Sequence, residues 1–166
     1  ISAQGAKGAV SADGPQTVER VQINKAMTGF LTHTGYSHGG NGYEGIAFLL
    51  DRFEGHELTD PTNPDHGLDL KAISHQFATQ YLQAKTTAKE QGAAGPPAVP
   101  GVNHPVFKGS LVNYDPRERF IARTMEERGD YNIFHDYYAH LVQALYDVGV
   151  SRYVYCVNID AVIAAL

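Results

Sequence analysis

The sequence has little cysteine and little positive charge. Cys156 is the single cysteine among 166 residues, which excludes an internal disulfide and a multi-cysteine zinc site. Thirteen Lys and Arg residues face 18 Asp and Glu residues, and the net charge of −5 argues against a broad nucleic-acid-binding surface. There is no recognisable signal peptide and no apolar run of membrane-spanning length, so we expect a cytoplasmic protein without a membrane partner.

Motifs of metal sites and of serine hydrolases are missing as well. His33 and His38 are five residues apart, as are His135 and His140, a spacing that does not place two histidines on one helix face. No H-E-x-x-H or G-x-S-x-G segment occurs, so we expect no metal and no Ser-His-Asp chemistry. Cys156 lies in an apolar run, which favours an inert thiol in the core.

Periodicity predicts a mainly α fold. The segment 152–159, "RYVYCVNI", is the exception, because its apolar run is typical of a short buried strand. The proline-rich connector 92–101 cannot be helical. Apolar residues recur at helical spacing in several stretches, and we expect helices at about 17–32, 43–53, 68–90, from 115 onward, at 132–148 and from about 160.

The domain organisation is expected to be simple. Residues 1–15 are rich in Gly, Ala and Ser and are interpreted as a flexible arm or a cut loop, whereas 16–166 would form one domain. The chain begins without a methionine and stops inside the apolar run "AVIAAL", so we interpret it as a piece of a longer protein.

A glycine cluster contains Gly40-x-Gly42-x-x-Gly45, which formally matches a dinucleotide-binding fingerprint. That fingerprint requires a preceding strand, and the residues before it have a helical pattern. We therefore favour a break between helices in which glycine lets two backbones approach closely.

The segment "NHPVFKGSLVNYDPRERF" (103–120) contains a helix start with an unusual cation. Asp115 as N-cap, Pro116 at the first position and Glu118 at the third form a capping-box pattern. Arg117 lies in the first turn, where the helix dipole disfavours a cation by up to about 1 kcal/mol. An anionic ligand there would reverse that effect, and His104 on the preceding loop could reach the same anion. Spacing alone leaves an anion site and a purely structural cap as alternatives.

Three segments together resemble the citrate synthase superfamily. "NHPVFKGSLVNYDPR" is similar to its G-H-x-V-[YFL]-[KR]…D-P-R loop, with Asn103 in place of a glycine and "GSLV" (109–112) as an insertion. Upstream, "SHGGN" (37–41) resembles H-G-G-A-N. Downstream, "VNID" (157–160) resembles the P-N-V-D or L-N-V-D segment. The resemblance covers citrate synthase and citryl-CoA lyase, including the C-terminal module of ATP-citrate lyase, and leaves the direction of reaction open.

The resemblance implies three catalytic residues and one substrate-binding residue. Asp160 would be the base that removes the thioester's methyl proton, and His38 would donate to the thioester carbonyl. His104 would protonate, or hydrogen-bond to, the oxaloacetate carbonyl, and Arg117 would bind a carboxylate of the same substrate. His104 would therefore serve in both catalysis and substrate binding.

The resemblance also implies a cofactor and an architecture. Coenzyme A would bind at Lys108 and along the backbone of Gly101, Val102 and Asn103, without a metal. The chain would be the small, CoA-binding helical domain of a two-domain fold, inactive alone and a homo-oligomer in the full-length protein. The alternative is an inactive CoA-binding or assembly module with the same fold.

Overall fold

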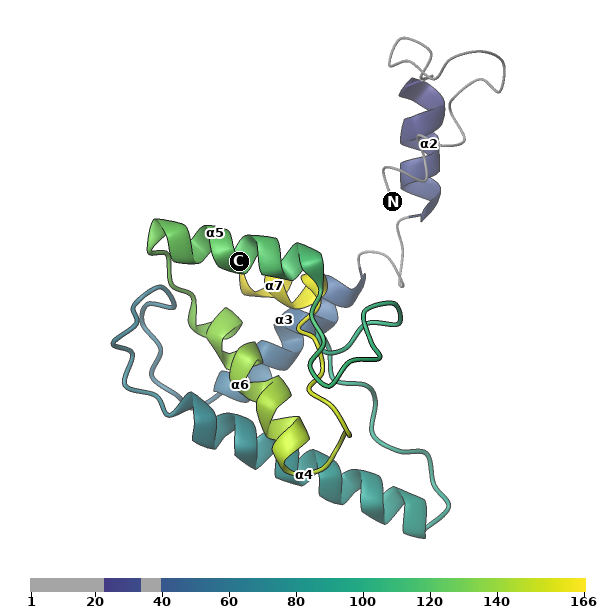
Figure 1. Cartoon of the computed structure of the whole chain (residues 1–166), viewed down its shortest axis with the longest axis vertical. Helices are drawn as coiled ribbons and strands as arrows, with labels where there is room; N and C mark the ends of the chain where they lie inside the picture. Colours follow the sequence, from purple (N-terminus) through teal and green to yellow (C-terminus); the bar gives the residue numbers. More distant parts are fainter. Residues whose placement is uncertain (1–22, 34–39) are drawn as a thin grey trace. The chain divides into compact units, whose positions relative to one another are not determined.

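The computed structural model describes residues 23–33 and 40–166. This part of the chain is mainly helical and contains no strand, which confirms the mainly α expectation (Figure 1). The finer citrate synthase-like architecture stays a prediction. The helices are α2 (Ile23–His33), α3 (Gly40–Phe53), α4 (Leu70–Glu90), α5 (Pro116–Arg128), α6 (Ile133–Asp147) and α7 (Ile159–Ala165).

The chain divides into two compact units, Ile1–Tyr43 and Glu44–Leu166. In the first unit the structure describes α2, an amphipathic helix on which Met27 and Leu31 are exposed. The predicted arm at 1–15 lies outside the described residues. All of the site residues discussed below belong to the second unit, except His38, which also lies outside the described residues.

The core of the second unit is built on α6, which packs against α4 on one side and against α7 on the other (Figure 1). Its buried face is continuous because the apolar residues repeat at helical spacing. Phe53 at the end of α3 meets Tyr137 and Phe134 edge to face, with ring centroids 5.3 and 5.1 Å apart. The fully buried apolar side chains of α6 are Ile133, Tyr137, Tyr138, Leu141 and Leu145.

Helix starts follow the capping residues in the sequence. Asp69, Asp115, Asn132 and Asn158 are the N-caps of α4, α5, α6 and α7, and each side chain accepts a backbone N–H of the first turn. The helices predicted at 68–90 and 132–148 are confirmed to within two residues. The one predicted from about 160 begins at Ile159.

The strand predicted at 152–159 is wrong. The segment makes only two isolated bridges, a parallel one between Val154 and Val112 and an antiparallel one between Val157 and Val102. The two neighbouring segments run in opposite directions and meet it at one position each, so no continuous ladder forms. The connector at 92–101 is non-helical, as predicted, and its prolines lack the N–H groups that a ladder needs.

The break between helices predicted at 40–45 is wrong, because these residues form the first turns of α3. A Cβ atom on Gly45 would lie 2.8 Å from the Cβ of Ala164, so glycine allows α3 to pack directly against α7. The expected close approach is confirmed at Gly45. Gly42 has no neighbour within 4 Å of such an atom.

Candidate functional site

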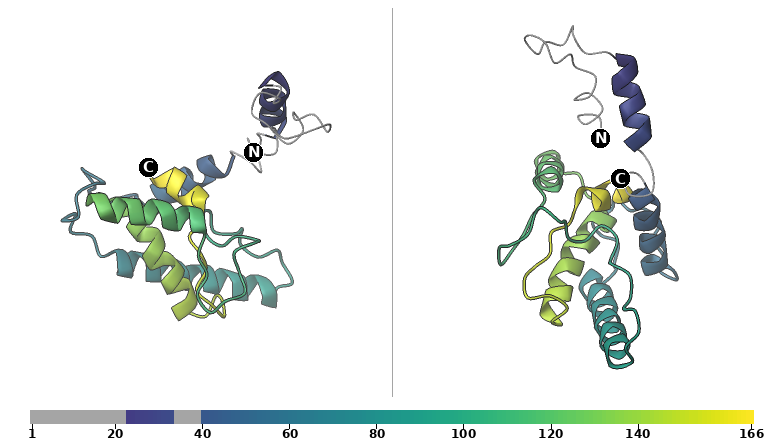
Figure 2. Two further views of the ribbon diagram at one scale, coloured as in Figure 1. Left: turned by 45° about the horizontal axis from the view of Figure 1, so that its top comes forward. Right: turned by 90° about the vertical axis from the view of Figure 1, so that its right-hand side faces the viewer.

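The segments 101–103 and 156–158 are more than fifty residues apart in the sequence and lie side by side next to α7 (Figure 2). The Asn103 amide donates to the Cys156 carbonyl at 2.7 Å, and the Asn158 amide donates to the Gly101 carbonyl at 3.0 Å. The Asn158 side chain adds a bond from its Nδ2 to the Asn103 carbonyl, also at 3.0 Å. These bonds place the segment that precedes His104 against the residues that lead into α7.

The close packing of this loop requires glycine at position 101. Gly101 has φ +75°, and a Cβ atom there would lie 2.6 Å from the Cβ of Ala161 and 2.9 Å from the Tyr138 hydroxyl. Asn103 is also left-handed, at φ 69°. Asparagine tolerates that conformation better than most residues do. Its presence where the resembling motif has glycine is therefore compatible with the same backbone path.

Asn158 also sets the start of α7 and thereby the position of Asp160. Its Oδ1 accepts the amide of Asp160 at 2.9 Å and the amide of Ala161 at 3.2 Å. The same side chain therefore holds the loop through Nδ2 and the helix through Oδ1. Asp160 lies in the first turn of α7, where a carboxylate is favoured by the helix dipole.

Asp115 joins the starts of α5 and α7. Its carboxylate is fully buried and accepts the Arg117 amide at 2.9 Å as well as the Ile159 amide at 3.2 Å. The expected N-cap is confirmed. Glu118, by contrast, contacts His135 Nε2 at 3.1 Å rather than completing a capping box.

The guanidinium of Arg117 folds back onto the same carboxylate. Its Nε and Nη2 donate to the two Asp115 oxygens at 2.9 and 2.6 Å, a two-pronged pair. This pair explains how the helix tolerates a cation in its first turn. Burial by itself would raise the pKa of Asp115, but the hydrogen bonds from Arg117 and Ile159 outweigh burial and lower it.

Arg117 also interacts with Asp160. The pKa of the guanidinium is raised, first by its hydrogen bonds to Asp115 and further by the negative charges of Asp115 and Asp160. The Arg117 side chain is 51% exposed, so one side of it faces solvent. The shared contacts of Asp115 with the Arg117 and Ile159 amides bring the starts of α5 and α7, which carry Arg117 and Asp160, close together.

Phe107 links His104 to Arg117, because its ring contacts both side chains. The rings of His104 and Phe107 stack with centroids 4.6 Å apart, and the Arg117 Cζ lies 5.7 Å from the Phe107 centroid. His104 Nδ1 accepts the Val106 amide at 3.1 Å. The neutral ring therefore carries its proton on Nε2, which leaves Nε2–H as a donor.

The predicted CoA-binding residues separate in the structure. Val102 and Asn103 line a small pocket of about 100 Å³ together with Tyr81, Lys85 and Tyr155. Gly101 packs against Ala161 instead, as described above. Tyr81, Lys85 and Tyr155 had no predicted role at this site, because they come from α4 and from the segment before α7.

Lys108 faces a different hollow, of about 280 Å³, formed by the inserted loop. Asn113 fixes this loop: its Oδ1 accepts the Ser110 amide, and its Nδ2 donates to the carbonyls of Ser110 and Val154. The insertion is thus held in a defined conformation. It leaves the side chains of Leu111 and Val112 exposed beside Lys108.

Cys156 is buried, as expected of a core thiol. Burial is the main cause that raises its pKa to about 11, which disfavours the reactive thiolate. Within 23–33 and 40–166, no group of three His, Cys, Asp or Glu residues is arranged to hold a metal ion. No helix among the described residues is long and apolar enough to cross a membrane.

Two partnerships at this site were not predicted from the sequence. Asp115 was assigned only to the helix cap, although the Asp-Pro-Arg spacing also allows its ion pair with Arg117. Phe107 carried no assigned role, although it contacts both His104 and Arg117.

Comparison of the chain with protein-family models, curated proteins and solved structures finds no match.

Proposed function

We propose that this chain carries part of an active site that forms or cleaves a carbon–carbon bond at citryl-CoA. The observation that supports it is that the Asp115 carboxylate joins the starts of the helices that carry Arg117 and Asp160, beside a phenylalanine ring that also stacks on His104. The motif resemblance assigns His104, Arg117 and Asp160, from separate segments, to one substrate. That assignment requires the three side chains to lie close to one another.

The chemistry needs a base and two hydrogen-bond donors. In the forming direction, the Asp160 carboxylate takes a methyl proton from acetyl-CoA while His38 donates to the thioester oxygen. His104 then donates its Nε2 proton to the oxaloacetate carbonyl oxygen as the new bond forms, which leaves the ring without that proton, and in cleavage the ring in this deprotonated state takes it back from the citryl hydroxyl. Groups of these kinds each contribute roughly 10²–10⁴-fold to such reactions.

Arg117 is suited to bind a substrate carboxylate with part of its guanidinium. Two of its N–H donors are bound to Asp115, and a guanidinium has further donors in the same plane. The Asp115 pair fixes the orientation of that plane before a substrate arrives. In this proposal, the pocket at Val102 and Asn103 receives part of CoA, and Lys108 contributes a positive charge at the separate hollow of the inserted loop.

A second candidate is an inactive CoA-binding or assembly module. The Asp115–Arg117 pair favours it, because the buried carboxylate already neutralises the cation that would attract the substrate. The inserted loop at 109–112 adds to the same alternative. This module would bind CoA but would not turn over acetyl-CoA or citrate.

The test compares His104→Ala and Asp160→Asn in the full-length protein, with citryl-CoA formation and cleavage measured by thioester absorbance. We expect each variant to lose at least 100-fold in turnover, in line with the contributions above. His75→Ala, an exposed histidine on α4, is the matched control and should keep the wild-type rate. Wild-type turnover in His104→Ala would contradict the proposal.

A binding measurement separates the two candidates. Calorimetric titration of the full-length protein with CoA should show binding that survives His104→Ala. CoA binding without any turnover in the wild type would favour the inactive module. Absence of both would contradict both candidates.

A further inference from the structure

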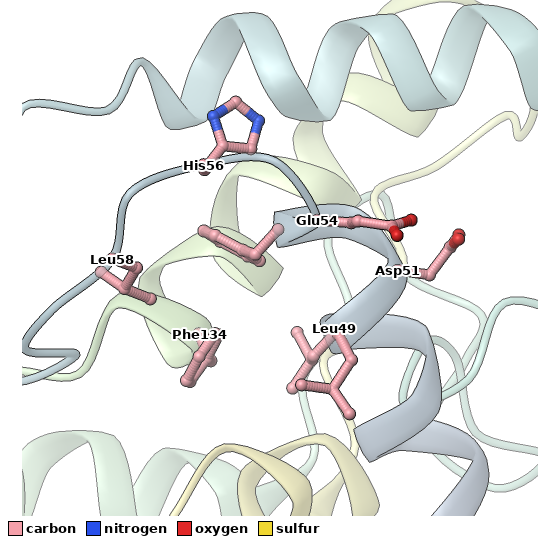
Figure 3. A pocket seen from close by; sticks show the side chains of 8 residues that line it. Leu49, Asp51, Glu54, His56, Leu58 and Phe134 are labelled. Carbon is pink, nitrogen blue, oxygen red and sulfur yellow. The ribbon is translucent and has the colours of Figure 1, made fainter.

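Another hollow lies on α3 and the turn that follows it. It encloses about 550 Å³ between the last turns of α3, the turn up to Leu58 and Phe134 of α6 (Figure 3). Its apolar lining comes from Leu49, Phe53, Leu58 and Phe134. This volume is large enough for a leucine or phenylalanine side chain. The pocket contains none of the residues assigned to citryl-CoA chemistry.

The rim of this pocket is acidic. Asp51 and Glu54 line it on one side, and their carboxylates lie away from Leu58 and Phe134 on the other (Figure 3). Glu57 and Asp60 follow in the same turn, and all four acids are exposed. Hydrogen bonds from the Thr62 side chain and amide lower the pKa of Asp60, so this carboxylate stays charged at neutral pH.

Arg52 is the one lysine or arginine in the sequence 51–60, and it offsets only the part of this charge that Asp51 carries. Its guanidinium lies over the ring of Phe77, 4.9 Å from the centroid, and pairs with Asp51. Its side chain is mostly covered as a result. The rim therefore presents the carboxylate of Glu54, followed in the same turn by those of Glu57 and Asp60, while Asp51 pairs with Arg52 and His56 also lines the pocket.

Exposed apolar side chains extend from the pocket along α3. Ile46 is 48% exposed and Leu50 is 67% exposed, and they stand one turn apart on the helix. Leu50 also lines the pocket. An apolar stripe that leads into an apolar pocket with an acidic rim fits a ligand that is apolar along one side and positively charged beside it.

We infer that this surface docks a basic amphipathic helix of a partner protein, with one large apolar side chain in the pocket and Lys or Arg residues against Glu54 and Glu57. Helix-in-groove recognition uses such an apolar anchor, and charge complementarity selects the partner. The inference is independent of the proposed function, because it uses none of its residues.

The charge pattern disfavours the other occupants. In a two-fold contact with a second copy of this chain, the same patch faces itself, which would place these carboxylates opposite one another. An anionic lipid surface would repel the same carboxylates. A basic helix is the occupant that gains from both the pocket and its rim.

The test uses three labelled synthetic helical peptides and fluorescence anisotropy with the 166-residue chain. The first peptide carries a leucine anchor flanked by lysines, the second replaces the anchor with serine, and the third replaces the lysines with glutamates. We expect micromolar to submillimolar binding of the first, and at least about tenfold weaker binding of the other two. An apolar anchor and charge pairs each contribute on the order of 1 kcal/mol or more.

Variants locate the binding surface. Leu50→Gln and the double variant Glu54→Lys with Glu57→Lys should each weaken binding of the first peptide about tenfold or more. These positions are exposed, so the fold should persist, and circular dichroism checks it. The matched control is Glu126→Lys with Glu127→Lys on α5, the same charge change at exposed positions that do not line the pocket. It should lose clearly less affinity than the rim variant.

Three results would overturn the inference. One is no binding of the first peptide up to millimolar concentration. Another is equal weakening by the rim variant and the α5 control, which would show a general charge effect. The third is a dimer in light scattering that Leu50→Gln dissolves, which would identify a second copy of the chain as the occupant.

Discussion

The α4–α6 core and the candidate site are held together in different ways. In the core, α6 packs against α4 and fully buries side chains such as Tyr137 and Leu141, and contact between apolar surfaces stabilises the packing. At the site, irregular segments are fixed by directional bonds from Asp115, Asn158 and Asn113. Each of these three side chains connects parts of the chain that are distant in sequence.

This difference matters for tolerance to substitution. An apolar core accepts other side chains of similar volume, because hydrophobic contacts have no fixed direction. A buried polar side chain with several partners accepts few replacements, because each lost bond leaves a buried group unsatisfied. The site should therefore respond to small chemical changes, and the core to changes of volume.

The largest loss of stability is expected from Leu141→Ala. This side chain is fully buried on α6, and its truncation should lower the free energy of unfolding by about 3 kcal/mol through lost contacts and a cavity. Urea denaturation measures the loss. Ile163→Ala, at an exposed position of α7, is the control and should change stability by less than about 0.5 kcal/mol. A loss below about 1 kcal/mol in Leu141→Ala would contradict the packing described for α6.

Gly101→Ala should destabilise by about 2–3 kcal/mol, because it combines a left-handed backbone with overlap against Ala161. Gly109→Ala separates the two causes. Gly109 has φ +112° but no atom within 4 Å of an added Cβ, so only the backbone strain of about 1 kcal/mol remains. Chemical denaturation of both variants gives the difference. Equal losses would show that loop and helix do not touch at Gly101.

Asp115→Asn tests the polar side of the comparison. The pKa of Asp115 is lowered in the folded chain, so its carboxylate contributes stability above the ordinary value of 3.8. That contribution is lost as pH falls through the lowered pKa. We expect the wild type to lose stability below about pH 4 and the variant to lose less over the same range. At pH 7 the variant should be less stable by about 1.5–3 kcal/mol, the range for hydrogen bonds to charged groups.

Identical acid profiles for wild type and Asp115→Asn would contradict the buried ion pair. Unfolding followed by circular dichroism from pH 7 to pH 2 supplies the comparison. Asp65→Asn, an exposed carboxyl in the turn before α4, serves as the control for a general effect of charge.

Tyr138→Phe should have the smallest effect. The Tyr138 hydroxyl is buried without a hydrogen-bond partner, so its removal should change stability by less than about 0.5 kcal/mol or increase it slightly. Tyr131→Phe is the contrast, because that hydroxyl accepts from His66 Nε2 and donates to Asp136, both at 3.0 Å. It should cost about 1–2 kcal/mol. Equal thermal shifts in the two variants would show that the Tyr138 hydroxyl is bonded.

The sequence predicted what depends on local rules. Helical periodicity located α4 and α6, and the capping residue Asp115 marked the start of α5 to the residue. The strand at 152–159 was wrong because an apolar run indicates burial, but a strand also needs a neighbour that runs beside it for several residues.

The site was predicted only as a set of residues. The motifs named His104, Arg117 and Asp160, but the bonds that bring their segments together are made by Asn158 and Asp115. These bonds span 55 and 44 positions in the sequence, and local patterns do not encode such contacts. The ion partner of Arg117 was missed because one carboxylate serves as both cap and counter-ion.

The hydrogen bonds of the Asn158 side chain to two segments couple the movements of these segments. One amide group holds the Asn103 carbonyl with its nitrogen and the first turn of α7 with its oxygen. Because one planar amide group makes both sets of hydrogen bonds, a displacement of the turn next to His104 would also displace the helix that bears Asp160. The His104 imidazole and the Asp160 carboxylate would therefore move together.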